Sequence, residues 1–188
     1  AGRLAQTLSS RRKRGQGAAI SDVGGPTGNM CASRCLTDAS RCQRASCLFP
    51  APCPHFHPGQ SESIELMRAV AALPGIAQVR LASGVRYDLG LLEPEALRAY
   101  IREFTGGQMK IAPEHVSETV LKLMRKPGPH ALEHFLDLFR QSSLKEQYII
   151  PYLMSAYPGC TDTHMRELAA WLKKRGWRPQ QVQCFIPT

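Results

Sequence analysis

Cysteine is concentrated in one short stretch of the chain. The segment CASRCLTDASRCQRASCLFPAPCPHFH holds five of the seven cysteines and two of the six histidines, between Cys31 and His57. Thiols gathered in this way act as metal ligands in a reducing compartment or form disulfides in an oxidising one. The odd number of cysteines and the absence of an apolar centre in AGRLAQTLSSRRKRGQG favour reduced thiols and metal binding. We therefore expect a cytoplasmic protein.

The charge of the chain is uneven. Its net charge is +9, and a run at the start supplies five positive charges from Arg3, Arg11, Arg12, Lys13 and Arg14. The remaining residues carry 19 bases against 15 acids, an ordinary balance for a globular domain. We expect residues 1–17 to form a poorly ordered, solvated basic arm. Nucleic-acid binding by this arm is the less favoured alternative.

The rest of the chain alternates short apolar runs with segments of helical period. The five runs are AAISDVGG, QVRLASGVR, QMKIAPEH, QYIIPYLMSAYPG and QVQCFIPT. Helices are predicted over residues 63–72, 94–104 and 117–124, and two amphipathic ones around residues 132–139 and 165–172. This alternation is typical of an α/β fold, with the five runs in one parallel sheet covered by helices. The pattern leaves open whether the sheet closes into a barrel.

Polar residues follow nearly every predicted strand. They are Asp22 with Gly24 and Gly25, Ser83 with Arg86, Glu114 with His115, and Ser155 with Gly159. Successive parallel strands place these ends at the same edge of a sheet, so the pattern predicts one pocket lined by several strands. Glu114 and His115 are candidate catalytic residues, because a carboxylate beside an imidazole can bind substrate or move a proton. Capping and packing are the alternative role for each of these residues.

Seven strings, in this order, carry a resemblance to a known family: ISDVGGPTGNM, CQRASCLFPAPC, LASGVRYDL, KIAPEH, MRKPG, EQYIIPYLMSAYPGCTD and QVQCFIPT. From about Ile20 to the last residue, the chain resembles the YgiQ-like family of radical S-adenosylmethionine (SAM) proteins. The resemblance implies a partial or full (β/α) barrel over residues 18–188. It also implies a [4Fe-4S] cluster that cleaves SAM to a 5′-deoxyadenosyl radical, with an electron donor such as flavodoxin or ferredoxin and an unknown substrate.

The resemblance assigns SAM-binding roles to four strand-end residues. Ser83 and Arg86 are expected to bind the ribose or the carboxylate of SAM, since hydroxyls suit sugars and guanidinium groups suit carboxylates. Pro158 and Gly159 are expected to let the backbone approach the adenine closely. Gly24, Gly25 and Pro26 are expected to form a tight turn at the rim of the pocket.

The ligands of the radical-generating cluster are missing from this chain. The family binds that cluster through Cys-x-x-x-Cys-x-x-Cys, but here the cysteine after Cys31 and Cys35 is Cys42, too far along the chain. In the family this motif lies upstream of ISDVGGPT. The chain also begins without methionine and ends in a strand-like run, CFIPT. We therefore expect a fragment covering the middle and later part of the barrel, inactive by itself.

The Cys-rich segment at about residues 30–60 then reads as an insertion with a different role. Cys35, Cys42, Cys47 and Cys53 form a C-x6-C-x4-C-x5-C array and match positions where similar family members also carry cysteine. Four thiolates can bind an auxiliary iron–sulfur cluster or zinc. The alternative is a set of small buried thiols, and His55 and His57 are expected to be exposed imidazoles in a proline-rich loop. A zinc-stabilised nucleic-acid-binding module is the alternative function for the whole chain.

Overall fold

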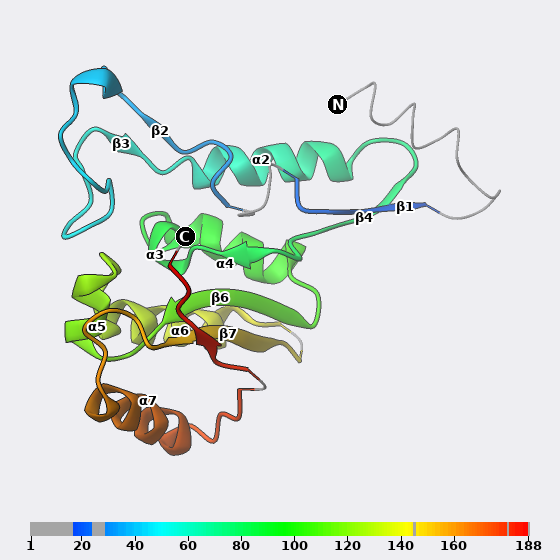
Figure 1. The fold of residues 1–188 in the computed structure, drawn as a ribbon. Coiled ribbons are helices and arrows are strands. Elements are labelled where there is room, and N and C mark those ends of the chain that lie inside the picture. The colour runs from blue at the N-terminus through cyan, green and yellow to red at the C-terminus, as the bar shows by residue number, and fades with distance from the viewer. Residues whose placement is uncertain (1–16, 24–28, 145, 180, 188) are drawn as a thin grey trace.

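The computed structural model describes residues 17–23, 29–144, 146–179 and 181–187. It is an α/β structure with two parallel sheets and one short antiparallel pair (Figure 1). The first parallel sheet pairs β1 (Ala18–Ser21) with β4 (Ile76–Arg80), and the second has the order β5-β6-β7-β8. Its strands are β5 (Gly84–Val85), β6 (Gln108–Glu114), β7 (Tyr148–Ser155) and β8 (Gln183–Cys184). The α/β class predicted from the sequence is confirmed.

The expectation of one continuous parallel sheet is wrong in detail. The second apolar run divides into β4 and β5, because residues 81–83 between them bond elsewhere. Leu81 N donates to Phe104 O (2.8 Å), and Ser83 N donates to Asp22 Oδ1 (2.8 Å). The strand order still follows the chain order from β5 to β8, so each connection steps to the next position in the same direction. With right-handed connections, this order places the helices on one face of the sheet.

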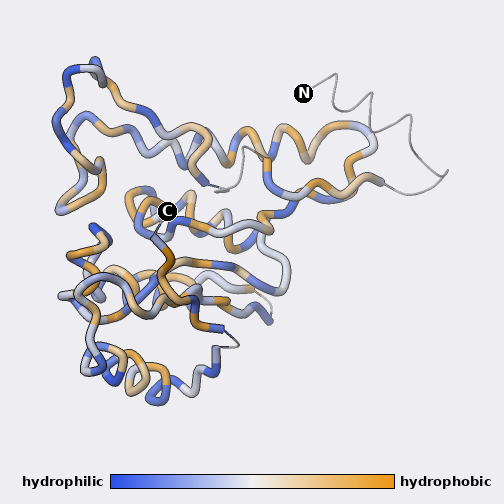
Figure 2. The backbone as a smooth tube through the Cα atoms, in the orientation of Figure 1, coloured by the Kyte–Doolittle hydropathy of each residue, from blue (hydrophilic) through white to orange (hydrophobic). Residues whose placement is uncertain are grey.

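The helices supply most of the core. They are α2 (Gln60–Ala71), α3 (Tyr87–Gly90), α4 (Pro94–Ala99), α5 (Glu118–Leu123), α6 (Pro129–Ser142) and α7 (Asp162–Lys174), and a π-helical turn, η2 (Tyr100–Phe104), continues α4. One cluster of buried side chains extends from Ile64 and Met67 of α2 to Leu168 of α7. Figure 2 shows hydrophobic and hydrophilic residues alternating along α7, as expected for a helix with one apolar face. The five predicted helices are all present, and α3 is an additional one.

The Cys-rich insertion is a hairpin that extends from the start of α2. Its stem pairs β2 (Arg34–Cys35) with β3 (Phe56–His57) in antiparallel fashion, and a short 3-10 helix, η1 (Ala39–Arg41), lies between them. In Figure 1 the hairpin is the blue and cyan part that extends beyond α2, on the side of α3 and α5. Among the described residues, no helix is long and apolar enough to cross a membrane.

Candidate functional site at the carboxyl ends of the strands

Three parallel strands end in the same uncommon backbone conformation. Asp22 after β1, Glu114 at the end of β6 and Ala156 after β7 have φ angles of 61°, 64° and 57°. This left-handed region is unfavourable for residues with a side chain, by about 1 kcal/mol or more each. The surrounding structure therefore holds the chain in a sharp turn at each of these strand ends. Such strain concentrates at functional sites, which makes the side chains at these strand ends candidates for ligand binding.

Asp22 organises the break between β4 and β5. Its Oδ1 accepts hydrogen bonds from Ala82 N, Ser83 N and Ser83 Oγ, each 2.8 Å long. The Ser83 hydroxyl hydrogen is thus already donated inside the protein, and only the oxygen lone pairs remain for a ligand. The predicted turn at Gly24, Gly25 and Pro26 follows directly, but it lies outside the described residues.

Arg86 lies just after β5 and is fixed through both its backbone and its side chain. The guanidinium forms a two-pronged contact with Asp88, at 2.7 Å from Nη2 to Oδ2 and 3.2 Å from Nε to Oδ1. This carboxylate raises the pKa of Arg86 further above its already high ordinary value. The backbone N and O of Arg86 both bond to the side-chain amide of Asn29, at 2.9 and 3.0 Å. The side chain is therefore oriented in advance, and 40% of it is exposed.

Asn29 was not identified from the sequence. It is fully buried, and its amide Nδ2 also donates to Gln60 Oε1 (2.9 Å), while Gln60 Nε2 donates to the Asn29 carbonyl oxygen (2.8 Å). These bonds connect the loop after β1 to the start of α2 and to Arg86. A single Asn in a loop rich in Gly and Pro forms no recognisable sequence motif. Only its burial in the structure shows that Asn29 has a structural role.

Glu114 and His115 do not face one another as a catalytic pair. The Glu114 carboxylate lies 3.3 Å from Lys126 Nζ. His115 is buried, its Nδ1 accepts a hydrogen bond from Ser117 N (2.9 Å), and its Nε2 lies 3.9 Å from Cys160 Sγ. Burial lowers the pKa of His115, so the neutral ring with the proton on Nε2 is favoured. The two neighbours in sequence thus have separate partners.

The loop after β7 packs against α5. Gly159 has φ of 87°, and a Cβ atom added there would lie 2.5 Å from Leu123 Cδ1. Cys160 N donates to Tyr157 O (2.7 Å), which closes the turn that contains Pro158. Burial raises the pKa of the Cys160 thiol. The close approach of Leu123 therefore already explains why position 159 is a glycine, without any contact to a ligand.

The four cysteines assigned to a metal lie along the hairpin. Cys35 is in the stem opposite Phe56, and Cys53 N donates to Cys47 O (2.7 Å), so the backbone brings the last two cysteines together. Within the described part of the chain, no three His, Cys, Asp or Glu side chains are placed to hold one metal ion. The thiols are therefore not assembled into a site in this structure.

A pocket of about 370 Å³ lies at the ends of β5 and β6. Its lining comes from the end of β5 and α3, from β6, from the segment after α5, and from the tip of the hairpin: Val85, Arg86, Tyr87, Asp88, Ala112, Met124, Arg125, Lys126, Pro127, Ala45 and Ser46. A larger cleft of about 990 Å³ begins at Gln108 and Tyr148, where β6 and β7 start, and reaches the segment after α7. Ligand sites of parallel α/β sheets lie at the carboxyl ends of the strands, so we assign the candidate site to the smaller pocket.

The fold is that of an α/β protein with a candidate ligand site at its strand ends, and comparisons with known proteins identify its family. Over 174 residues, 90% of this chain, it is 46% identical to a UPF0313 protein of Geobacter sulfurreducens, 44% to one of Pseudomonas syringae pv. tomato and 42% to the UPF0313 protein YgiQ of Salmonella typhimurium. The chain belongs to the UPF0313 family. It spans 29%, 23% and 24% of the length of these three relatives. No family model matches the chain.

Proposed function

We propose that the chain is a segment of the (β/α) barrel of a radical SAM enzyme, with its strand-end pocket facing cofactor and substrate. The main support is the strand order β5-β6-β7-β8, which follows the chain order as in a (β/α) barrel. Two further observations support a radical SAM function. The chain has the seven strings that resemble the radical SAM family, and it belongs to UPF0313. The enzyme as a whole supplies an adenosyl radical through its cluster and SAM.

The residues present do not fit the radical-generating cluster. The Cys-x-x-x-Cys-x-x-Cys motif does not occur in the 188 residues, so the chain has no ligand set for it. We assign no reaction step to these residues through that cluster. What the chain offers is binding and orientation at the strand ends.

The four residues assigned to SAM differ in how well they fit that role. Arg86 lines the pocket, and its guanidinium is partly exposed and held in place by Asp88, which suits recognition of a carboxylate. Ser83 is held by Asp22, and Gly159 is packed against Leu123. We propose that Arg86 contacts the carboxylate of SAM, and that Ser83, Pro158 and Gly159 shape the strand ends around it.

The proposal predicts different activities for two proteins. After anaerobic reconstitution with iron and sulfide and reduction by dithionite, the Geobacter sulfurreducens relative should produce 5′-deoxyadenosine from SAM. The 188-residue chain, treated identically, should produce none above a control without protein. Absence of product from the reconstituted relative contradicts the radical SAM assignment, whereas product from the chain alone contradicts its assignment as a segment without the cluster.

We further propose that Cys35, Cys42, Cys47 and Cys53 bind an auxiliary iron–sulfur cluster or zinc. The hydrogen bond between the Cys47 and Cys53 backbones and the place of Cys35 in the adjacent stem support this set. Metal binding can draw such ligands together, because its free energy is coupled to folding.

Metal content of protein purified without oxygen tests this set. Cys47→Ser and Cys53→Ser should each lower the bound iron or zinc relative to the wild type. Cys184→Ser, in β8, is the matched control and should retain the metal. Equal metal content in all four proteins contradicts the assignment.

A further inference from the structure

The segment after α5 carries an arginine where glycine is the usual residue. Lys126 N donates to Leu121 O (2.9 Å) and Arg125 N donates to Lys122 O (3.1 Å). This pair of bonds is the Schellman motif that ends many helices, and its left-handed position is normally glycine. Here Arg125 occupies it, with φ of 54°. A side chain in this conformation is unfavourable, so the arginine is retained at a cost to folding.

The side chain of Arg125 lines the rim of the strand-end pocket. Among the residues that the structure describes, its guanidinium has no hydrogen-bond or ion-pair partner. The other charged groups of the lining are engaged: Arg86 with Asp88, and Lys126 with Ala112 O (2.6 Å) and Glu114. Arg125 therefore offers unused donors to a molecule in the pocket.

The charge of the lining favours an anion. Asp88 pairs with Arg86 and Glu114 pairs with Lys126, so the three cations of the lining exceed their paired carboxylates by one positive charge, that of Arg125. The hairpin contributes Ala45 and Ser46 to the lining, so segments far apart in the sequence bound the pocket. A volume of about 370 Å³ is within the range of small-molecule sites.

We propose that Arg125, together with Lys126, binds a phosphate or carboxylate group of a small molecule other than SAM in this pocket. Assigning that molecule to the substrate rests on the function proposed above, whereas the binding itself does not. The guanidinium provides two parallel donors that match the two oxygens of such a group. The strained backbone holds Arg125 at the rim, and the hairpin limits the size of the ligand.

Titration of the 188-residue chain with inorganic pyrophosphate, followed by amide NMR shifts, tests the proposal. The wild type should bind with shifts at Arg86, Ala112 and Arg125, and the affinity should fall as salt is added. Arg125→Gly and Arg125→Gln should each weaken binding about tenfold. Arg125→Gly should keep or raise the thermal midpoint, because glycine is the residue favoured at this position. A purely structural role for Arg125 would not lower pyrophosphate affinity in a variant that is equally stable.

Two comparisons complete the experiment. Arg166→Gln removes an exposed arginine on α7, outside the pocket, and should leave pyrophosphate affinity unchanged. Arg125→Gln should leave the affinity for SAM unchanged. An equal loss of affinity for SAM and pyrophosphate would show that Arg125 serves the SAM carboxylate and would overturn the proposal, as would undiminished pyrophosphate affinity in the Arg125 variants. Neither result would alter the production of 5′-deoxyadenosine by the Geobacter sulfurreducens relative, so the two proposals fail separately.

Discussion

Asn29 connects three segments that are far apart in the sequence. Its side chain bonds to the backbone of Arg86 and to Gln60, and no water reaches this fully buried amide. Truncation leaves several buried donors and acceptors without partners, each costing about 1 kcal/mol or more. We expect Asn29→Ala to lower the free energy of unfolding in urea by about 3 kcal/mol. Gln43→Ala, at an exposed position of the hairpin, should change it little, and equal stability of the two variants would contradict the role of Asn29.

His115 makes stability dependent on pH. Burial lowers its pKa from the ordinary 6.5, while the Glu167 charge opposes the shift and the His164 charge adds to it. The unfolded chain therefore binds a proton at a higher pH than the folded chain does, and stability is lost as the pH falls below 6.5. The free energy of unfolding should decline less steeply below pH 6.5 in His115→Gln than in the wild type. Identical slopes would show that His115 titrates normally in the folded protein.

The sequence singles out some of these residues but does not indicate the geometry between them. Glu114 and His115 are candidates because polar residues follow an apolar run. The two side chains have different partners because Glu114 has a left-handed φ angle. The preference of glutamate for particular backbone conformations does not predict this angle. Asn29 and Arg125 became candidates only through burial and backbone conformation.

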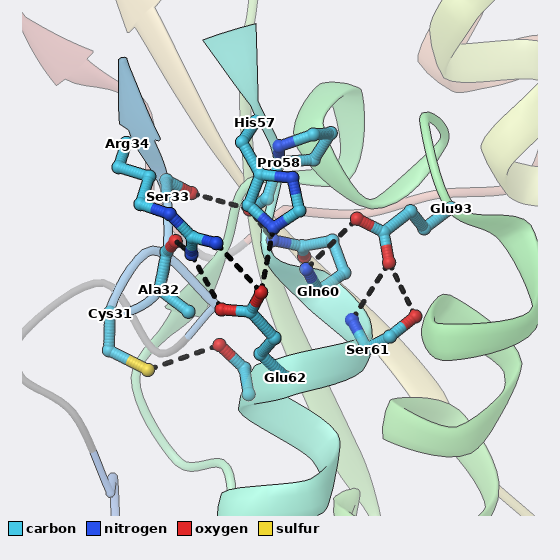
Figure 3. Close-up of polar contacts among 11 residues, drawn as sticks. Cys31, Ala32, Ser33, Arg34, His57, Pro58, Gln60, Ser61, Glu62 and Glu93 are labelled. Atoms are coloured by element: carbon cyan, nitrogen blue, oxygen red, sulfur yellow. Dashed lines mark hydrogen bonds and ion pairs between the residues drawn. The ribbon is translucent and has the colours of Figure 1, made fainter. Parts of the chain in front are cut away.

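At the scale of elements, the hairpin is fastened to α2 by ionic contacts (Figure 3). The Glu62 carboxylate accepts from Arg34 Nη1 (2.6 Å) and Nη2 (2.9 Å) and lies 3.0 Å from His57 Nε2. The Arg34 hydrogen bonds lower the pKa of Glu62 to about 2, so the contact persists at moderately acidic pH. The expectation of exposed imidazoles holds for His55, whereas the side chain of His57 is 31% exposed and lies against Glu62 of α2.

Removal of the Glu62 charge should loosen the stem of the hairpin. In Glu62→Gln, amide hydrogen exchange of β2 and β3 should become faster, while exchange in β6 stays unchanged. Glu65→Gln replaces an exposed glutamate on the same helix and is the control. Unchanged exchange in the stem would show that backbone pairing, and not this ion pair, holds the hairpin.

The start of α2 shows why helix boundaries escaped prediction. Residues 63–72 have the helical pattern, but the helix begins at Gln60, after Gly59 with φ of 66°. Glu93, from another segment, accepts hydrogen bonds from Gln60 N (3.2 Å) and Ser61 N (2.8 Å) and so caps the helix. A cap supplied from 32 residues away is not visible in a local pattern.

At the scale of the whole molecule, the alternation of runs and helical segments was sufficient to predict an α/β fold. The division of the parallel strands into two sheets depends on the side chain of Asp22, which binds the backbone of residues 82 and 83. The pocket lies at the ends of β5 and β6, but of the strand-end residues predicted from the sequence only Arg86 lines it. Its cationic lining requires the segment after α5 to fold back over β6.

Binding of ligand at the carboxyl ends of the strands is tested most directly by an NMR titration of the isotopically labelled chain with SAM. Amide shifts are expected at Arg86 and Glu114, at the strand ends, with little change at Gln108 and Tyr148, where the strands begin. Arg86→Gln should reduce the affinity about tenfold. Shifts concentrated at Gln108, Tyr148 and Trp177 would contradict binding at the strand ends and assign the ligand to the larger cleft.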